Sequence, residues 1–294
     1  MYKLVAIDLD GTLLNSYGEV SDKNKNAIKK AIEEGIEVVI ASGRMPGSIK
    51  PITEEINANN YIISGNGTMI YDVKNDEIIY DKFIEKEKVL EIIKVCEENS
   101  IYYNIYTEHS IIAKSLNYNV LYYHYENSKR KPEKRSNINL VEDVYKYMEQ
   151  INTSKVLKIT ICDNDKIIFD RIIENKLRKI NGIDVLDVAH MSRKAIKSGT
   201  EEVKIEYFYT EITKKDANKW TAIEFLINKL NINKKEVVGI GDNVNDKEMV
   251  ENAGLGVSIG ESYLESKKIG DVFVANNNND GVAEAFEKYI LNSW

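Results

Sequence analysis

Two short apolar runs that each end in acidic residues constrain the fold of this chain more than any other feature. One run, YKLVAIDLD, ends in Asp8 and Asp10, and the other, VVGIGDNVND, ends far along the chain in Asp242 and Asp246. Continuous apolar runs of this length are typical of parallel strands that are covered on both faces. Because ligands of an open α/β sheet bind beyond the carboxyl ends of its strands, we expect both acidic clusters at one crevice.

Two other runs are expected to end at the same crevice. EVVIASGR, residues 37–44, passes from apolar residues into Ser42 and Gly43, and YIISGNG, residues 61–67, passes into Asn66. Glycine and small polar residues that close an apolar run are the pattern of a buried strand entering a loop. Four strands therefore carry polar tips, and the sequence predicts an α/β fold built on a parallel sheet.

Helical segments are expected between these strands. Ser21 is a candidate N-cap for NKNAIKKAIEE, and Gly35 is the expected stop of that helix. A second helix is expected at residues 245–252 and is expected to stop at Gly254.

The acidic clusters also predict chemistry. Carboxylates held close together repel one another unless a cation lies between them, and a site of few oxygen ligands suits a partly hydrated magnesium ion. Magnesium attracts phosphate, and a carboxylate can attack phosphorus to form an aspartyl-phosphate. Asp8 is the candidate nucleophile. Asp10 is the candidate that protonates the leaving oxygen and later deprotonates water.

The two acidic motifs resemble those of the haloacid dehalogenase-like phosphatases. DLDGTLL at residues 8–14 is similar to the first motif of that family, and GDNVND at residues 241–246 is similar to the fourth. The resemblance implies a Rossmann-like parallel-sheet core and an aspartyl-phosphate mechanism, with Asp8 as nucleophile and Asp10 as acid/base. It also implies a magnesium ion (Mg2+) held by Asp8, the backbone carbonyl of Asp10, and Asp242.

The resemblance extends to phosphate binding. Ser42 matches the family's second motif, whose hydroxyl binds the transferring phosphoryl group. Lys219 in DANKWTAIEFL matches the third-motif lysine, which neutralises the phosphate and the nucleophile. The implied phosphate-binding positions are Leu9, Ser42, Gly43, Lys219 and Asn245, and the implied supporting positions are Thr12, Asn66, Asn243 and Asp246.

The order and spacing of the motifs resemble the Cof-type subgroup, which carries a large α/β cap inserted between the third core strand and the third-motif helix. ASGR followed by ISGNG, and the closing run GVAEAFEKYIL, are typical of that subgroup. We therefore expect a catalytic core at residues 1–83 and 211–294, and an inserted substrate-specificity cap at residues 84–210. Trp220 departs from the subgroup, which usually has Gly after the lysine.

The middle of the chain is predicted to be a separate α/β unit, because 294 residues exceed the usual size of one compact domain. Helices are expected at residues 86–99 and 166–179. Strands are expected at IYYNIY, SIIAKSL, VLKITIC, GIDVLDVA and VKIEYFYTEI. The connections to the core are expected near residues 81–86 and 209–214.

Three features of this middle segment invite a functional interpretation. The run KRKPEKR at residues 129–135 either attracts an anionic substrate or is solvated surface. A group of tyrosines either stacks against a substrate ring or fills half-buried core; they are Tyr102, Tyr103, Tyr106, Tyr118, Tyr122, Tyr123 and Tyr125. His190, or nearby Arg193, is a candidate for facing the substrate.

The composition sets the expected partners and compartment. The formal net charge of −7 and the pI near 5.3 disfavour a nucleic-acid-binding surface, so a small phosphorylated metabolite is the expected partner. Cys96 and Cys162 suit packed thiols rather than a disulfide framework. No run approaches the roughly 20 apolar residues that span a bilayer, and candidate catalytic residues begin at Asp8. No membrane partner or signal peptide is therefore expected, and the cytoplasm is the expected compartment.

Three other functions share part of this pattern. A phosphomutase would use the same aspartyl-phosphate to move a phosphoryl group between sugar positions, and a sugar bisphosphate requirement would reveal it. A non-catalytic phosphometabolite sensor would not need a nucleophile together with an acid/base. A receiver-type phosphoacceptor domain would leave the inserted segment unexplained. The sequence therefore favours a magnesium-dependent phosphatase of small phosphomonoesters, such as sugar phosphates or cofactor phosphates, and leaves the oligomeric state open.

Overall fold

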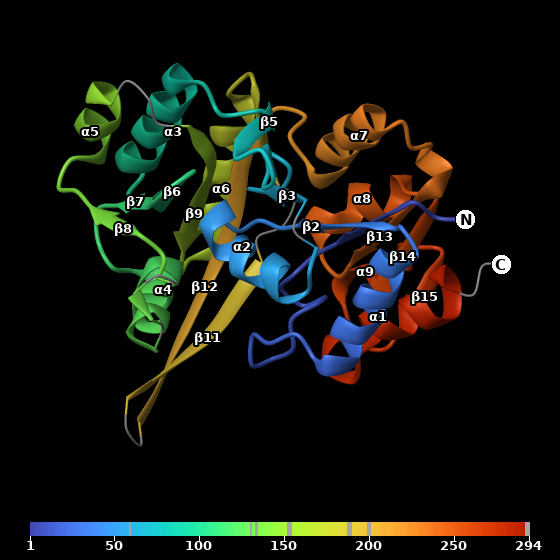
Figure 1. The fold of residues 1–294 in the computed structure, drawn as a ribbon. Coiled ribbons are helices and arrows are strands. Elements are labelled where there is room, and N and C mark those ends of the chain that lie inside the picture. The colour runs from blue at the N-terminus through green and yellow to red at the C-terminus, as the bar shows by residue number, and fades with distance from the viewer. Residues whose placement is uncertain are drawn as a thin grey trace. The chain divides into compact units, whose positions relative to one another are not determined.

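The computed structural model describes residues 1–58, 60–129, 131–132, 135–151, 155–186, 190–198 and 201–291. The chain divides into two compact units (Figure 1). The core unit comprises residues 1–81 and 217–294, and the inserted unit comprises residues 82–216. No helix among the described residues combines the length and the apolar character that crossing a membrane requires.

The core unit contains an eight-stranded sheet in the order β15-β14-β13-β1-β2-β3-β4-β5. Its strands are β1 (Leu4–Ile7), β2 (Glu37–Ala41), β3 (Tyr61–Ser64), β4 (Met69–Asp72), β5 (Glu77–Asp81), β13 (Val237–Gly241), β14 (Leu255–Ile259) and β15 (Val272–Val274). The strands from β15 to β3 run parallel, whereas β4 and β5 extend the edge as an antiparallel hairpin. The predicted parallel sheet is confirmed, whereas β14, β15 and the hairpin were not predicted from the sequence.

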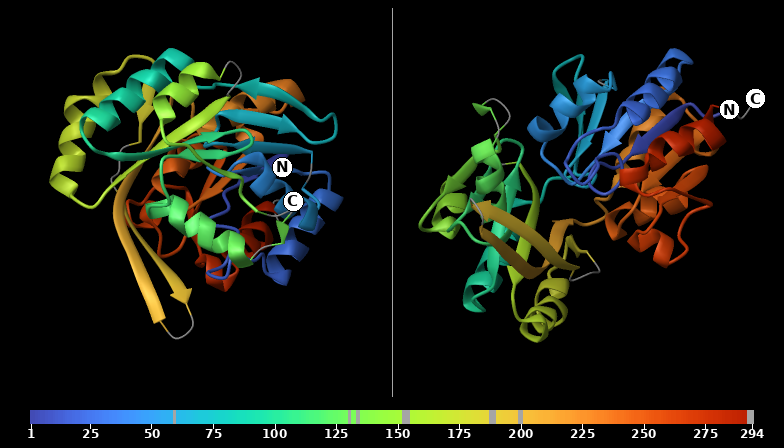
Figure 2. Two further views of the ribbon diagram at one scale, coloured as in Figure 1. Left: turned by 90° about the vertical axis from the view of Figure 1, so that its left-hand side faces the viewer. Right: turned by 90° about the horizontal axis from the view of Figure 1, so that it is seen from below.

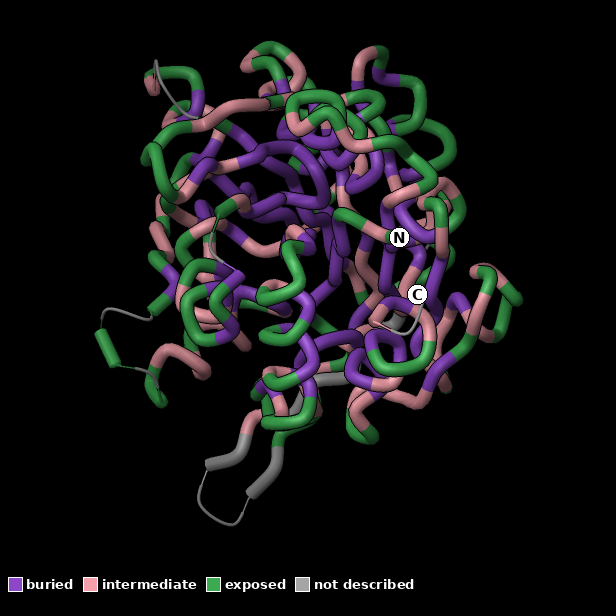
Figure 3. The backbone as a smooth tube through the Cα atoms, turned by 45° about the vertical axis from the view of Figure 1, so that its right-hand side comes forward, coloured by how far each residue is buried: buried purple, intermediate pink, exposed green. Residues whose placement is uncertain are grey.

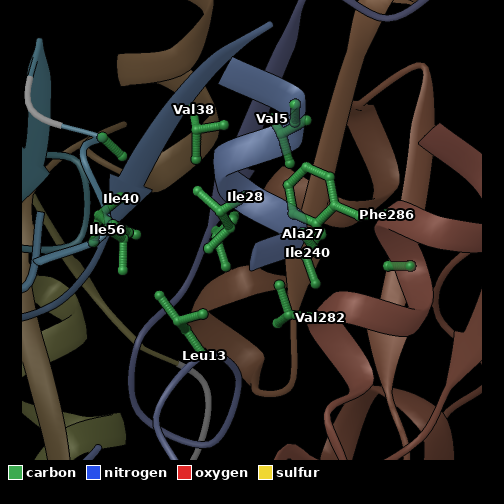
Figure 4. Packing of buried hydrophobic residues seen from close by; sticks show 14 of the residues in the cluster. Val5, Leu13, Ala27, Ile28, Val38, Ile40, Ile56, Ile240, Val282 and Phe286 are labelled. Carbon is green, nitrogen blue, oxygen red and sulfur yellow. The ribbon is translucent and has the colours of Figure 1, made fainter. Parts of the chain in front are cut away.

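Helices cover both faces of this sheet. They are α1 (Asp22–Glu33), α2 (Pro46–Glu55), α7 (Lys219–Leu230), α8 (Lys247–Asn252), α9 (Tyr263–Ser266) and α10 (Gly281–Ala285), with the turns η3 (Lys234–Glu236), η4 (Val244–Asp246) and η5 (Asn277–Asn279) and the π-helical turn η6 (Phe286–Ile290). On one face Val5, Val38 and Ile240 pack against α1 and α10 (Figure 4). On the other face Leu4 and Val39 pack against α7 and α8. This double burial explains why the strands are continuous apolar runs.

Local signals set the ends of α1 as predicted. Ser21 is the N-cap, and its hydroxyl accepts a hydrogen bond from the backbone N–H of Asn24 at 3.2 Å. The chain leaves the helix at Gly35, whose φ of +84° is a left-handed conformation that glycine adopts without strain. The second predicted helix begins as the turn η4, continues as α8 and ends at Asn252.

The inserted unit contains a seven-stranded sheet in the order β10-β12-β9-β6-β7-β8, with β11 paired to β12. Its strands are β6 (Tyr102–Thr107), β7 (Ile111–Ala113), β8 (Ile138–Leu140), β9 (Val156–Asp163), β10 (Ile183–Val185), β11 (His190–Ser198) and β12 (Glu201–Lys214). Its helices are α3 (Lys86–Glu98), α4 (Tyr118–Lys129), α5 (Val144–Gln150) and α6 (Lys166–Asn175), followed by the turn η2 (Leu177–Lys179). The predicted helices and strands of this unit are present, although β10 covers only the first part of GIDVLDVA, and residues 187–189 of that run lie outside the described residues. Elements α4, α5, β8 and β11 were not predicted.

The two faces of the seven-stranded sheet differ in chemistry. On one face α3, α5 and α6 cover an apolar cluster in which Ile92 and Phe169 pack with Ile105. Helix α4 lies on the opposite face, where the side-chain amide of Asn119 donates a hydrogen bond to the hydroxyl of Tyr106 at 2.9 Å. Figure 2 shows α3 and α4 on opposite sides of the strands. Figure 3 shows that the buried stretches of the chain run mainly through the interior, and that the exposed stretches lie mainly at the periphery.

The connection back to the core unit lies later in the chain than the sequence predicts. Residues 208–212 pair with β9 and residues 212–214 pair with β10, so the predicted hinge at 209–214 is part of β12. Strand pairing on both sides holds this segment within the sheet, and the division between the units falls after Asp216. The first division falls after Asp81.

Candidate active site

Acidic residues of the core unit meet beyond the carboxyl ends of β1 and β13, which are neighbours in the sheet. Asp8 directly follows β1, and its backbone N–H donates to the carbonyl of Ile240 at 3.0 Å. Asp242 directly follows β13. Ligand oxygens of Asp8, Asp242 and Asp246 lie within 4.8 Å of one another. The parallel topology therefore brings two distant sequence segments to one point.

Lys219 lies within this acidic group. Its Nζ donates to Oδ1 of Asp8 and to Oδ1 of Asp246, each at 2.5 Å, and its side chain is fully buried. Lys219 is the first residue of α7, which starts with a capping box centred on Asn218. Trp220 is compatible with this helix start, because its side chain is buried in the apolar cluster between α7 and the sheet.

Two glycines allow backbone segments to come close to these residues. Gly11 has a φ of +92°, and a Cβ at this position would lie 2.5 Å from Oδ2 of Asp242. Gly67 has a φ of +90°, and a Cβ there would lie 2.0 Å from the carbonyl oxygen of Asn218, at the start of α7. Both positions combine a left-handed conformation with a close approach, so a larger residue would displace the site's loops.

Both carboxylate oxygens of Asp246 accept hydrogen bonds from neighbouring groups of the site. Its Oδ1 accepts from Lys219, and its Oδ2 accepts from the backbone N–H groups of Asp242 and Asn243, each at 3.1 Å. Both oxygens are therefore occupied in fixing the lysine and the loop after β13. The supporting role predicted for Asp246 stays a prediction, which these hydrogen bonds favour.

Asp8 and Asp242 each keep one carboxylate oxygen unpaired. Lys219 occupies Oδ1 of Asp8, and the hydroxyl of Thr12 donates to Oδ1 of Asp242 at 2.7 Å. The two Oδ2 atoms have no hydrogen-bond partner in the part of the chain that the structure describes. Hard oxygen donors, with more carboxylates than lysines among them, suit a hard cation. The residues present therefore fit a metal ion.

The crowding of charges changes the acidity of these groups. Burial, and then the neighbouring Asp246, raise the pKa of Asp8 to about 7, against the opposing effect of Lys219. Burial and the nearby Asp8 raise the pKa of Asp242 well above its ordinary value. Burial alone would lower the pKa of Lys219, but Asp246 and Asp8 outweigh it and raise this pKa. A cation beside the carboxylates would favour their charged forms.

The structure pairs Asp10 with Arg44. The guanidinium donates from Nε to Oδ2 of Asp10 at 2.8 Å and from Nη2 to Oδ1 at 2.6 Å. The Asp10 side chain is 62% exposed, unlike the buried Asp8. The sequence analysis assigned no role to Arg44, although its place two residues after Ser42 at a polar strand tip was an available signal. The proposed metal contact through the backbone carbonyl of Asp10 stays a prediction.

Other predicted positions form hydrogen bonds that connect the loops after β2, β3 and β13. Ser42 is buried, and its hydroxyl oxygen accepts from the backbone N–H of Arg44 at 3.2 Å. The carbonyl of Ser42 accepts from the backbone N–H of Asn66 at 3.0 Å. The side-chain amide of Asn245 donates to Oδ1 of Asn66 at 3.1 Å. These contacts place Ser42 and Asn245 in one connected group of loops.

Three further predicted positions lie in the same loops. Leu9 is buried in the apolar cluster beside α1, Gly43 separates Ser42 from Arg44, and Asn243 is the N-cap of η4. The phosphate-binding roles that the resemblance implies for these loop positions stay predictions.

The candidate residues of the inserted unit are described only in part. The side chains of His190 and Arg193, and positions 130, 133 and 134 of the KRKPEKR run, lie outside the described residues. Tyr103 is buried, and the rings of Tyr102 and Tyr118 pack with their centroids 5.2 Å apart. These contacts favour core packing for these three tyrosines.

Fold and site together define a class: an α/β protein with a buried lysine and carboxylates at the strand ends of a Rossmann-like sheet, and a second α/β unit inserted into that core. A family model of the haloacid dehalogenase-like hydrolases matches residues 5–286. The chain belongs to this family, which confirms the family predicted from the sequence and makes the chain a hydrolase.

Individual relatives match over nearly the whole chain. Phosphatase YwpJ of Bacillus subtilis (strain 168) is 29% identical over 294 residues, which cover 98% of this chain and 100% of the relative. The structure of a haloacid dehalogenase-like hydrolase from B. subtilis matches with a TM-score of 0.78 and 26% identity, covering 98% of this chain and 99% of that one. Another such hydrolase, from Bacteroides thetaiotaomicron, matches with a TM-score of 0.75 and 27% identity over 98% and 99% of the two chains. The inserted segment is therefore a feature that this chain shares with its relatives.

Proposed function

We propose that this chain is a magnesium-dependent phosphatase that hydrolyses small phosphomonoesters through an aspartyl-phosphate on Asp8. The observation that carries the proposal is the buried carboxylate of Asp8, with Oδ1 held by Lys219 and Oδ2 unpaired in the same group as Asp242. An oxygen fixed in orientation, but not consumed by a hydrogen bond, is what a nucleophile requires. The similarity to Phosphatase YwpJ supports phosphate esters as the substrate class.

Asp8 and Asp242 are the proposed side-chain ligands of the magnesium ion, together with the backbone carbonyl of Asp10. When bound, the ion would neutralise the carboxylates and polarise the phosphoryl oxygens. Asp246 would remain outside the ligand set, because its two oxygens already accept hydrogen bonds from Lys219 and from the loop after β13.

The protein groups divide the reaction into two displacements. In the first, Oδ2 of Asp8 attacks phosphorus, the bond from phosphorus to the ester oxygen breaks, and Asp10 gives its proton to the leaving alcohol. In the second, Asp10 takes a proton from water, the water oxygen attacks phosphorus, and the bond between Asp8 and phosphorus breaks to release inorganic phosphate. Lys219 stabilises the negative charge on the phosphoryl group, while Ser42 and Asn245 orient it.

Arg44 is the proposed positioning residue for Asp10. Its two hydrogen bonds hold both oxygens of that carboxylate, which fixes the orientation of the group. Because Asp10 is well exposed, it can exchange this partner for the leaving oxygen during turnover.

The inserted unit is the proposed specificity cap. An enzyme that forms a covalent intermediate needs to exclude bulk water until the alcohol has left. A closing cap would provide that exclusion. Small phosphorylated metabolites are therefore the proposed substrates, and the acidic net charge disfavours nucleic acids as an alternative.

The decisive test compares Asp8→Asn with Asp22→Asn. Asp22 lies in the first turn of α1 with a side chain 97% exposed, so its variant controls for the loss of one carboxylate. We expect kcat for p-nitrophenyl phosphate with magnesium to fall at least about 1,000-fold in Asp8→Asn, because an amide cannot attack phosphorus, and to be unchanged in Asp22→Asn. A folded Asp8→Asn protein that retains activity within tenfold of the parent would show that Asp8 is not the nucleophile.

A further inference from the structure

The chain contains two Asn-Gly dipeptides, at residues 66–67 and 181–182. In this dipeptide an asparagine side chain reacts readily with the next main-chain nitrogen, because glycine places no side chain in the way and its backbone moves freely. Both dipeptides lie in turns, and Gly67 and Gly182 have left-handed φ values of +90° and +88°. The two sites therefore share their local chemistry, and the structure around each one decides whether it reacts.

The first dipeptide is held in place within the core unit. Asn66 is only 6% exposed, and its Oδ1 accepts a hydrogen bond from the side-chain amide of Asn245 at 3.1 Å. The backbone N–H of Gly67, which contains the nitrogen that would react, donates to the carbonyl of Ser64 at 3.1 Å. A Cβ on Gly67 would lie 2.0 Å from the carbonyl oxygen of Asn218, so this segment has little space to rearrange. The structure therefore protects Asn66.

The second dipeptide, in the turn before β10, is accessible. Asn181 is exposed. Neither its side-chain amide nor the backbone N–H of Gly182 forms a hydrogen bond with another residue in the part of the chain that the structure describes. A Cβ built on Gly182 would meet only Cε of Lys88, at 4.0 Å, among the described residues. Both reacting groups therefore have the freedom that the buried pair lacks.

We propose that Asn181 is a modification site, at which the folded protein deamidates without an enzyme and forms isoaspartate that loosens the end of the inserted unit. The backbone nitrogen of Gly182 loses its proton and bonds to the side-chain carbonyl carbon of Asn181. The bond from that carbon to the amide nitrogen breaks, and ammonia leaves with the proton. Water then opens the resulting succinimide ring at either carbonyl, which gives aspartate or isoaspartate. The only co-reactant is water.

The turn before β10 holds the last residues of the inserted unit. The carbonyl of Gly182 accepts from the backbone N–H of Lys215 at 3.0 Å, and Oδ2 of Asp184 accepts from the backbone N–H of Asp216 at 2.7 Å. Strand β10 pairs with residues 212–214 of β12. Isoaspartate lengthens the main chain by one methylene group directly before these contacts. The turn and β10 then cannot both keep their present partners, so the backbone N–H groups of Lys215 and Asp216 are released.

The first measurement is the rate of modification at each dipeptide. The parent chain is incubated in neutral buffer, folded or unfolded in urea, and mass spectrometry follows the peptides that contain Asn66 and Asn181, with aspartate and isoaspartate separated by chromatography. In the folded chain we expect Asn181 to react at least about tenfold faster than Asn66, because reaction at Asn66 requires local opening of the structure. In urea the two rates should become similar, since the dipeptides are chemically alike. Asn181→Gln should abolish the fast reaction, because its longer side chain forms a ring far more slowly.

The second measurement is hydrogen exchange at the backbone N–H groups of Lys215 and Asp216. Exchange should be at least about tenfold faster in the isoaspartate fraction than in freshly prepared parent, because the turn no longer protects these groups. Asn181→Asp is the matched control, since it carries the new charge on an unaltered main chain, and it should exchange as the parent does.

Two results would overturn the proposal. Equal rates at the two dipeptides in the folded chain, or no reaction at Asn181, would show that this turn is not a modification site. Unchanged exchange in the isoaspartate fraction would show that the modification does not loosen the end of the unit. Neither measurement uses enzymatic activity, so both results are independent of the proposed phosphatase function.

Discussion

The core unit and the inserted unit each bury a lysine against carboxylates, and they do so in different surroundings. In the core unit Lys219 contacts Asp8 and Asp246, each at 2.5 Å, and its side chain has no exposed surface. In the inserted unit Lys158 contacts Glu211 at 2.5 Å, and the two side chains are 7% and 15% exposed. The first group has an excess of carboxylates, whereas the second has matched charges.

This difference indicates which of the two charged groups needs a further ion. Buried carboxylates with excess negative charge are stable only beside a cation, so the core group favours the binding of a metal ion. A bound metal ion in turn attracts an anion. The pair of Lys158 and Glu211 has no such demand, because its two charges already match. The core group therefore has an unbalanced charge, whereas the pair in the inserted unit does not.

The largest expected difference between the units comes from removing each lysine. Lys219→Met leaves Asp8 and Asp246 buried without their cation, and breaking a buried pair in this way costs about 3–5 kcal/mol. Lys158→Met breaks a single pair that is less deeply buried, so we expect a smaller loss of about 1–3 kcal/mol. The measurement is the free energy of unfolding in urea with excess chelator.

The two lysine variants should also differ in catalytic activity. With magnesium present, Lys219→Met should lower kcat for p-nitrophenyl phosphate at least about 100-fold, because a donor beside the transferring group is lost. Lys158→Met should change it little, because Lys158 pairs with Glu211 in the inserted unit and has no proposed role in the reaction. Similar losses of stability and activity in the two variants would contradict the division of roles between the units.

The second prediction concerns metal removal and pH in the core unit. Burial and Asp246 raise the pKa of Asp8 from 3.8 to about 7 in the metal-free protein. The folded state therefore holds the proton more tightly than the unfolded state, so stability is lost as the pH rises from about 4 to about 7, and the loss is complete above that range. We expect the chelated protein to be more stable at pH 5 than at pH 7.5.

Magnesium should reverse this loss, because it binds the ionised carboxylates. At a concentration 100-fold above its dissociation constant the ion would add about 2.7 kcal/mol of stability. The increase in midpoint temperature should therefore be larger at pH 7.5 than at pH 5, and Asp242→Asn should reduce it at both values. An equal increase at the two pH values would contradict a site that includes Asp8.

The sequence predicted those parts of the fold whose signals are local. Continuous apolar strands, the Ser21 cap and the acidic strand ends can be recognised within a few residues, and parallel topology then requires Asp8 and Asp242 to meet. Strands β4 and β5 were missed because they form a short edge hairpin in which β5 is half-exposed and lacks a continuous apolar pattern. The second division between the units was placed too early because the apolar pattern does not show where β12 loses its partners.

Side-chain pairing was the least accessible part of the candidate site. Arg44 and Asp10 are separated by a whole helix in the sequence, and only the adjacency of β1 and β2 brings their loops together. The pair of Lys158 and Glu211 joins β9 to β12 and depends on the register of these strands, so neither residue carries a sequence signal for the pair. Such contacts are properties of the tertiary structure rather than of any segment.

The last prediction makes the same substitution, threonine to valine, in both units. It is the closest matched comparison and has the smallest expected effect. Thr12 is 0% exposed and its hydroxyl donates to Asp242 at 2.7 Å, whereas Thr160 is 3% exposed and its hydroxyl has no partner among the described residues. Thr12→Val should cost about 1.5–3 kcal/mol of unfolding free energy, the contribution of a hydrogen bond to a charged group, and should weaken magnesium binding. Thr160→Val removes no internal hydrogen bond and replaces an unsatisfied hydroxyl with a methyl group, so stability should be unchanged or higher. Urea unfolding of both variants in chelator, with a magnesium titration of each, measures the contrast. Equal losses of stability would mean that the hydroxyl of Thr160 is satisfied within the protein.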